Sequence, residues 1–185
     1  RLTSIASNKV LLLEAGGKDT NLWIHIPGGY FKTMHNPKTD WCFKTQFEKG
    51  LGDRQMNYPR GKTLGGSSSI NGLLYIRGQS QDYDYWRQLG NVGWSWDDVL
   101  PYFKKSENNQ RGENDFHGAA GPLSVEDMRV KMKVLDTFIN AASEFGYKHQ
   151  SDFNTGDNEG IGYFQVTQKN GFRCSAAVGY LNPIK

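Results

Sequence analysis

The sequence predicts an α/β protein with a parallel sheet. The first observation is the apolar run from Val10 to Leu13, which ends at Glu14 and a glycine pair. A short apolar run stopped by glycine is typical of a strand buried on both faces of a parallel sheet. The second observation is the amphipathic helical pattern of residues 130–145, which lies between two segments with strand patterns.

Composition and charge exclude several classes of protein. The chain has 185 residues, with 22 Lys and Arg against 19 Asp and Glu, and a formal net charge of +3. That charge is too small for a dedicated nucleic-acid binder, and no basic cluster compensates for it. No apolar run reaches the roughly 18 residues that a membrane span needs. The 22 glycines and the 13% of aromatic residues rule out simple disorder and indicate tight turns.

The cysteines and the first residue bear on the setting of the chain. Cys42 and Cys174 lie far apart and form neither a disulfide framework nor a metal motif. We therefore expect no metal, and a cytoplasmic location rather than a secreted one. The chain opens with Arg1 and shows no signal-peptide pattern, so we interpret it as an internal piece of a longer protein.

The first half of the chain alternates between short regular elements and irregular segments. Residues 1–9 fit the end of a helix that leads into the strand at 10–13, which is half of a βαβ unit. Residues 18–60 carry scattered Pro, Gly and aromatic residues, so we expect a packed segment with little regular structure. Residues 81–89 have helical spacing.

A capped helix and a loop are predicted next. The Ser95 hydroxyl can cap a helix that begins at Trp96, and Pro101 then kinks this helix or starts a new first turn. Residues 106–118 are polar and predict a loop. We expect a half-buried strand at 123–126, because its apolar and polar residues alternate.

Residues 130–181 predict a helix, a strand, a tight turn and a short helix. Gly146 is the natural stop of the helix at 130–145. A second strand is expected over residues 161–167, and Asn170-Gly171 is a strong tight-turn pair. Residues 174–181 can form a short helix that ends before Pro183.

Glu14 is the first residue with two interpretations. An acidic side chain at the carboxyl end of a strand in a dinucleotide-binding fold accepts hydrogen bonds from an adenosine ribose. Such a residue lies about 20 positions after a Gly-rich turn, which here would fall just before Arg1. Alternatively, Glu14 is a surface residue that follows a core strand, and the sequence leaves both interpretations open.

The segment Gly65-Gly66-Ser67-Ser68-Ser69 also has two interpretations. It could be a flexible linker. However, it runs directly into Ile70 and four further large residues, Leu73, Leu74, Tyr75 and Ile76, which favour burial. Two glycines before hydroxyl residues let a backbone approach a phosphate or a flat ring closely, with amides and hydroxyls as donors. The flanking residues favour a binding site.

A longer stretch around this segment resembles a known family. Residues 61–71 read GKTLGGSSSIN and are followed by Tyr75, Gly78 and Asp84. This pattern is similar to the first signature of the glucose–methanol–choline (GMC) oxidoreductases, which are FAD-dependent alcohol oxidases and dehydrogenases. Other segments typical of the family follow the family's order over the whole chain: Leu12–Gly16, Tyr58–Arg60, Tyr75–Gly78, Gly93–Trp96 and Arg173–Ala177. The nearest branch is the choline-dehydrogenase-like one.

The resemblance implies a role for each matching position. Glu14 would hold the adenosine ribose of FAD. The positions expected along the cofactor, close to its pyrophosphate, are Arg60, Leu64, Gly65, Gly66 and Ser67. The positions expected to approach the isoalloxazine ring are Asn71, Gly72, Leu73 and Leu74. Some members attach FAD covalently through a His just before the Asn; Ile70 stands there in this chain, so we expect noncovalent FAD.

The resemblance also implies two incomplete domains. An FAD-binding Rossmann-like part would take residues 1–118 and 171–185, and part of a substrate domain on an antiparallel sheet would take residues 119–170. The family's N-terminal Gly-rich turn and its C-terminal catalytic His have no match here. We therefore expect no catalytic residue in this chain, and ordinary surface or loop positions for the four histidines: His25, His35, His117 and His149.

The activity implied is the oxidation of a small-molecule alcohol, with hydride transfer to the flavin N5. The sequence does not determine the alcohol or the electron acceptor. Two alternatives stay open, namely a lyase or photodecarboxylase on the same scaffold, and a non-catalytic truncated fragment. We expect the isolated chain to be inactive and to bind FAD weakly or not at all.

Overall fold

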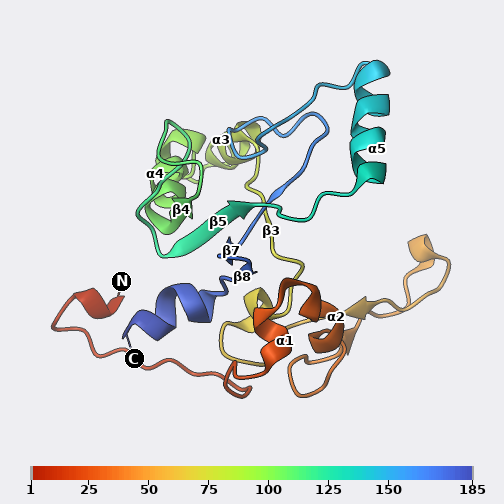
Figure 1. Ribbon diagram of the computed structural model, residues 1–185. Coiled ribbons are helices and arrows are strands. Elements are labelled where there is room, and N and C mark those ends of the chain that lie inside the picture. Colours follow the sequence, from red (N-terminus) through yellow and green to blue (C-terminus); the bar gives the residue numbers. More distant parts are fainter. Residues whose placement is uncertain (1, 185) are drawn as a thin grey trace.

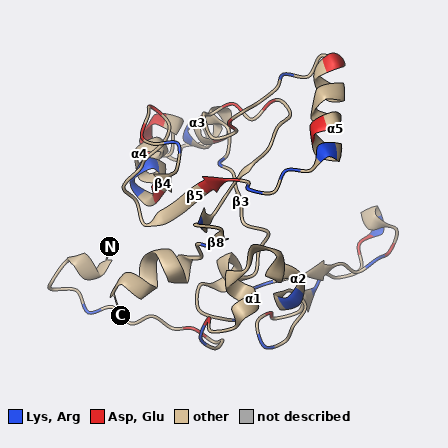
Figure 2. Ribbon diagram, in the orientation of Figure 1, with Lys and Arg blue, Asp and Glu red and all other residues tan. Residues whose placement is uncertain are grey.

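The structure, a computed structural model, describes residues 2–184 and has two lobes (Figure 1). Arg1 and Lys185, at the ends of two predicted segments, lie outside the described residues. One lobe holds the N-terminal segment, α1, α2 and the C-terminal helical segment, and the other holds α3, α4, α5 and most of the main sheet. Mixed helices and sheets confirm the predicted α/β class. In Figure 2, basic and acidic segments are distributed over both lobes.

The main sheet has four strands in the order β3-β6-β5-β4. Its strands are β3 (Leu74–Tyr75), β4 (Glu107–Asn109), β5 (Leu123–Asp127) and β6 (Gln165–Val166). The β3–β6 and β5–β6 pairs are antiparallel, whereas β4 and β5 are parallel. Two of the strands precede residue 118 and two follow it, so the sheet joins the two predicted domains, and the division between them stays a prediction.

The apolar run at residues 10–13 departs most from its prediction. No strand forms there, and Leu11 and Leu13 are 81% and 82% exposed. A strand is stabilised by ladder hydrogen bonds to a neighbour, and no segment of residues 2–184 pairs with this run. The prediction of a buried strand is therefore wrong for this structure. The preceding residues form only the 3₁₀ turn η1 (Leu2–Ser4) rather than the end of a helix.

Residues 18–60 are irregular, as predicted. They contain only short elements: α1 (Leu22–His25), η2 (Pro27–Gly29), α2 (Tyr30–Thr33), β1 (Phe43–Lys44), η3 (Lys49–Leu51) and β2 (Asn57–Tyr58). The buried carboxylate of Asp40 holds much of this segment together, because it accepts backbone hydrogen bonds from His35, Cys42 and Arg60 at 2.7–2.9 Å. Burial alone would raise its pKa, but these N–H donors hold the pKa of Asp40 below its ordinary value.

The predicted helical pair at residues 80–106 is present. Helix α3 (Ser80–Gln88) packs against α4 (Trp96–Ser106) through Tyr83, whose ring centroid lies 5.8 Å from those of Trp96 and Phe103. The predicted cap forms a capping box, because Ser95 and Asp98 bond each other's backbone amides. Helix α4 runs through Pro101, which therefore starts no new helix.

The C-terminal elements follow their local signals closely. Helix α5 (Lys133–Glu144) ends before Gly146, whose φ is 103°. Asn170 and Gly171, with φ of 53° and 81°, connect β7 (Gln168–Lys169) to β8 (Phe172–Arg173). Two positive φ values are the requirement of a tight hairpin turn. The last elements are the π-helical turn η5 (Ala177–Leu181) and η6 (Asn182–Ile184).

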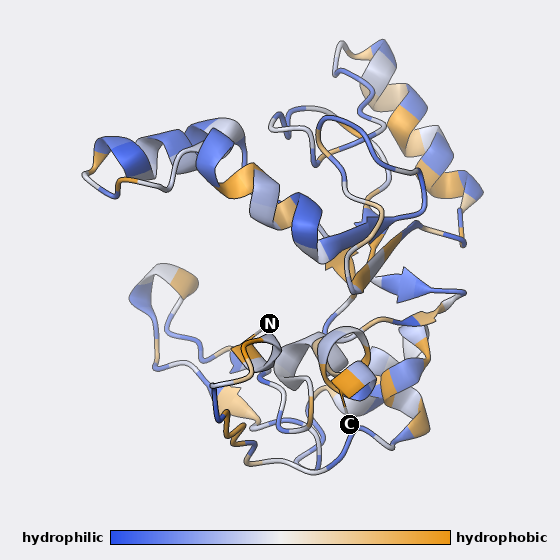
Figure 3. Cartoon of the chain, turned by 90° about the vertical axis from the view of Figure 1, so that its left-hand side faces the viewer, coloured by the Kyte–Doolittle hydropathy of each residue, from blue (hydrophilic) through white to orange (hydrophobic). Residues whose placement is uncertain are grey.

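Much of α5 faces away from the core. Only Ile139 of this helix is buried, and Figure 3 shows apolar segments along its exposed length. The expected second strand at 161–167 is also shortened, to the two residues of β6. Among residues 2–184, no helix combines the length and hydropathy needed to cross a membrane.

Candidate active site

The double-glycine segment forms a tight loop instead of a linker. Gly65 and Gly66 have φ of 87° and 56°, and the 3₁₀ turn η4 (Gly66–Ser69) follows. A Cβ on Gly65 would lie 2.4 Å from the Ser69 hydroxyl oxygen and 3.2 Å from the Ala177 methyl group. A Cβ on Gly66 would meet nothing within 4 Å. The loop is therefore packed against protein at Gly65 and open at Gly66, which is the geometry of a cradle for a ligand.

Gly61 lets a second backbone segment lie against this loop. A Cβ at Gly61 would lie 2.2 Å from both the carbonyl carbon and the oxygen of Gly66. We expect Gly61→Ala to lower the free energy of unfolding by about 1–3 kcal/mol, because a backbone must shift to admit the methyl group. Urea unfolding measures this change. Gly50→Ala is the matched control, since a Cβ there meets nothing within 4 Å; equal effects of the two changes would contradict the packing.

The three serine hydroxyls have different partners. Ser68 and Ser69 donate to the carbonyl oxygens of Gly65 and Leu64 at 2.6 and 2.7 Å, so they close the loop instead of facing a ligand. The Ser67 oxygen accepts the Gly61 amide at 3.1 Å and an Nη1–H of Arg60 at 3.4 Å. Of the three serines, Ser67 is therefore the one whose hydroxyl contacts the exposed Arg60 guanidinium.

Arg173 supports the loop from the protein interior. Its buried guanidinium donates to the carbonyl oxygens of Ile24, Ser68 and Asn71, and to the Asn71 side-chain oxygen, at 2.7–3.0 Å. Burial lowers the pKa of Arg173 to about 10. The Asn71 oxygen also accepts the Leu73 amide at 3.0 Å. This oxygen is therefore committed, and the exposed Asn71 amide nitrogen remains as the donor toward a ligand.

Glu14 lies on a segment that contacts the same loop region. Its carboxylate is exposed and accepts the Gly16 amide at 2.7 Å. Gly17 pairs with Thr63, and its carbonyl oxygen accepts the Leu64 amide at 2.9 Å. The structure thus brings the neighbourhood of Glu14 to the first glycine of the loop. The ribose contact and the other predicted cofactor contacts stay predictions.

An apolar cleft of about 660 Å³ opens beside the predicted ring-facing residues. Gly72 and Leu73 line it, together with residues from η2, α2 and the segment before α5. Leu73 has a φ of 66° and is buried, whereas Leu74 is exposed. A Cβ on Gly72 would meet nothing within 4 Å. The volume is within the range of small-molecule sites.

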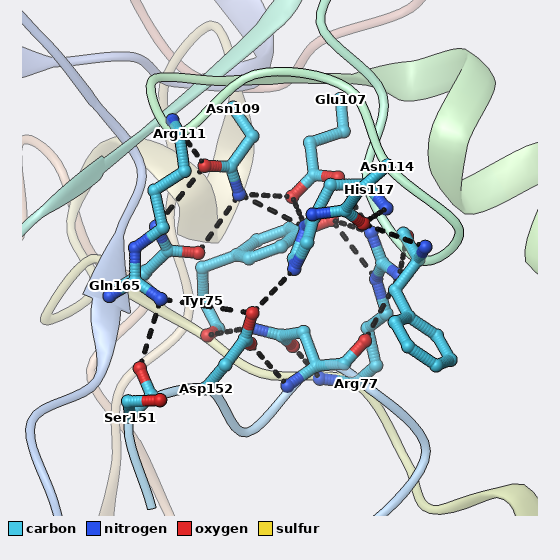
Figure 4. A network of polar contacts seen from close by, with 12 residues as sticks. Tyr75, Arg77, Glu107, Asn109, Arg111, Asn114, His117, Ser151, Asp152 and Gln165 are labelled. Carbon is cyan, nitrogen blue, oxygen red and sulfur yellow. Dashed lines mark hydrogen bonds and ion pairs between the residues drawn. The ribbon is translucent and has the colours of Figure 1, made fainter.

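A buried polar network lies behind β3, the strand that follows this loop (Figure 4). Arg77 and Glu107 form an ion pair at 2.8 Å, with side chains 1% and 0% exposed. The His117 ring lies between two carboxylates, with Nδ1 at 3.0 Å from Glu107 and Nε2 at 2.7 Å from Asp152. The predicted loop at 106–118 therefore contains β4, in which Glu107 and Asn109 are buried because they find partners.

The network holds His117 as a cation. Burial opposes the charge, but hydrogen bonds to Asp152 and Glu107 outweigh it and raise the pKa of His117 to about 9. Burial likewise opposes ionisation of Glu107 and Asp152, yet hydrogen bonds from His117 hold the pKa of each below its ordinary value. His117 lies in the loop between β4 and β5, as one part of the expectation had it, but it is 0% exposed, so the expectation of an ordinary surface position is wrong here.

The same network holds β3 in place through hydrogen bonds, and β3 directly follows the glycine loop at residues 61–71. Asn154 accepts the Arg77 amide at 2.9 Å and donates to the Tyr75 carbonyl oxygen at 3.3 Å. The Tyr75 hydroxyl accepts from the Arg77 guanidinium at 3.4 Å. Sequence reasoning did not find this role, because the partners lie far apart in the chain; only Tyr75 and Arg77 fell within a quoted motif.

The mixed α/β fold, the tight glycine loop and the adjoining apolar cleft define a class of protein that can hold a nucleotide cofactor. Residues 10–185 match the family model described as GMC oxidoreductase. The chain belongs to the GMC oxidoreductase family, and the predicted resemblance is confirmed.

Relatives and solved structures agree with this assignment. The chain is 42% identical to an alcohol dehydrogenase (acceptor) of Pseudomonas putida over 100% of its length, and 40% identical to an oxygen-dependent choline dehydrogenase of Sinorhizobium medicae over 99%. Pyridoxine 4-oxidase from Mesorbium loti superposes with a TM-score of 0.92 at 28% identity, covering 98% of this chain and 36% of that one. An FAD-dependent oxidoreductase from Chaetomium thermophilum superposes at 0.87 and 28% identity, covering 99% and 33%.

The chain spans only about a third of the curated relatives it matches, 34% and 33% of the two named above. The matches support FAD as the cofactor, whereas its noncovalent attachment stays a prediction.

Proposed function

We propose that this chain forms the FAD-binding part of an oxidoreductase that acts on the CH–OH group of a small-molecule alcohol. The observation that carries the proposal is the loop at Gly65-Gly66, packed against protein on one glycine and open on the next. The names of the relatives, alcohol dehydrogenase and choline dehydrogenase, support an alcohol as the substrate.

The residues present fit a flavin nucleotide. The open α-carbons of Gly66 and Gly72 leave room for close approach, and the exposed Arg60 guanidinium offers charge to a phosphate. The Asn71 amide nitrogen is free to donate to a ring edge, because Arg173 already holds its oxygen. FAD, when bound, supplies the ring that accepts hydride from the carbinol carbon.

His117 is excluded as the base that takes the alcohol proton. Both ring nitrogens are hydrogen-bonded to carboxylates, and these contacts raise the pKa of the ring to about 9. A base must have a free lone pair within reach of the substrate. The resemblance implies a catalytic His, and His117 does not take that role.

A cytoplasmic location remains a proposal. It is supported by two free cysteines, of which Cys42 is exposed and Cys174 is buried. Exposed free thiols are typical of proteins in reducing compartments.

The cofactor assignment is testable at Gly72, whose backbone has no positive φ and whose Cβ would face open space. We expect Gly72→Leu to raise the Kd for FAD at least about tenfold, because the side chain fills the space assigned to the ring. Flavin fluorescence during titration of the chain measures this change, with wild-type affinity itself expected to be weaker than about 1 μM.

Gly50→Leu is the matched control, because a Cβ there also meets nothing within 4 Å and Gly50 lies in η3, outside the loop at residues 61–71. Both substitutions should leave the free energy of unfolding within about 0.5 kcal/mol of wild type. A wild type that binds FAD with the same Kd as Gly72→Leu would overturn the proposed site.

A further inference from the structure

We propose that the cleft beside Gly72 accepts the apolar, uncharged end of an alcohol and discriminates against a quaternary ammonium group. The inference rests on the proposed function, which places the cofactor ring beside Gly72 and hence the substrate in the adjoining cleft. The named relatives make this distinction meaningful, because one is a choline dehydrogenase and choline carries a permanent positive charge.

Apolar side chains from two separate segments form most of the lining. Those that the argument uses are Tyr30 and Phe31 of α2, and Met128, Val130, Met132 and Leu135 from the end of β5 to the first turn of α5. Burial of methyl groups against such surfaces favours binding in proportion to the area removed from water. An alcohol with a branched hydrocarbon end fits this lining.

The charges near the cleft are already paired. Arg129 is the charged residue among the described residues that line it, and its Nε and Nη2 donate to Glu126 at 3.2 and 3.1 Å. The Glu126 carboxylate also accepts the Asn170 amide at 2.6 Å and the Gly171 amide at 3.4 Å. Among the described residues that line the cleft, a quaternary ammonium would therefore meet a guanidinium and no uncommitted carboxylate.

The aromatic rings of Tyr30 and Phe31 are the strongest argument that the cleft would instead prefer a quaternary ammonium group. Their centroids lie 4.0 Å apart with planes tilted by 32°, and Phe31 is 72% exposed. A cation over rings at an exposed site gains roughly fivefold in affinity at most. A tert-butyl and a trimethylammonium group bury the same methyl groups, so the charge decides between them. Lost hydration without a pairing carboxylate opposes the cation.

Two isosteric probes test the preference directly, namely choline and 3,3-dimethylbutan-1-ol, in which carbon replaces the nitrogen. Each is titrated into the chain labelled with ¹³C at the methionine methyl groups. Met128 and Met132 line the cleft, whereas Met34 and Met56 do not and report nonspecific effects. We expect the neutral alcohol to shift the Met128 and Met132 signals with a Kd at least about tenfold lower than that of choline.

A pair of substitutions in the first turn of α5 separates the charge of the cleft from other effects. Leu135→Asp places a carboxylate in the lining and is expected to lower the Kd for choline at least about tenfold. Val134→Asp is the control, because Val134 is exposed in the same turn and does not line the cleft. Both positions tolerate an acid, since carboxylates are favourable near a helix N-terminus.

Equal or tighter binding of choline by the wild type would overturn the proposal, as would the failure of both probes to shift Met128 and Met132. FAD is absent from these titrations, so their outcome is independent of the Gly72 experiment. A chain that binds FAD through Gly72 yet prefers choline would lose this inference and keep the proposed function. A preference for the neutral alcohol, without loss of FAD binding in Gly72→Leu, would keep this inference and overturn the proposed cofactor site.

Discussion

Replacing Arg77 with methionine is expected to lower the free energy of unfolding by about 3–5 kcal/mol, because it removes one of the two cations that pair with a buried carboxylate and leaves only His117. Glu107 is 0% exposed and lies 2.8 Å from the Arg77 guanidinium. The same guanidinium also donates to the Phe116 and Asn154 carbonyl oxygens, which would lose their donors. Urea unfolding monitored by tryptophan fluorescence measures the loss.

Lys148→Met is the matched control for this charge removal. Lys148 pairs with Asp157 at 2.9 Å, and both side chains are exposed. Exposed ion pairs contribute less than about 1 kcal/mol, so this change should be small. Comparable losses in the two variants would show that the burial of the Arg77 pair has no energetic consequence.

Local signals in the sequence predicted their elements well. The turn at Asn170-Gly171 and the stop of α5 at Gly146 depend on backbone conformations that the residues themselves favour. The loop at residues 61–71 was found for a similar reason. The loop needs its glycines at fixed positions close together in the chain, so the motif can be recognised from the sequence alone.

Features that depend on distant partners were not predictable in the same way. The run at Val10–Leu13 has the composition of a buried strand, but burial requires a neighbouring strand that residues 2–184 do not supply. His117 is the opposite case: the polar residues around it in the sequence indicate an exposed loop, but the side chain is buried. It is buried because its two ring N–H groups donate to Glu107 and to Asp152, which lies 35 residues away. Neither outcome is encoded within a short window of sequence.

Stability should decrease as the pH rises through the titration of His117. The folded state raises its pKa from 6.5 to about 9, so the folded protein binds the proton more tightly than the unfolded chain does. The resulting stabilisation is fully present below pH 6.5 and is lost between pH 6.5 and about 9. Because His117 is fully buried, we expect this contribution to be about 3 kcal/mol.

His117→Gln removes the titrating group, so its unfolding free energy should fall less steeply with pH over this range. The difference between wild type and variant should be greatest below pH 6.5 and smallest near pH 9. His149→Gln, at an exposed histidine, should run parallel to wild type. If the His117 variant also ran parallel, His117 would not be held as a cation between Glu107 and Asp152, and β3, the strand that follows the glycine loop, would depend on other contacts.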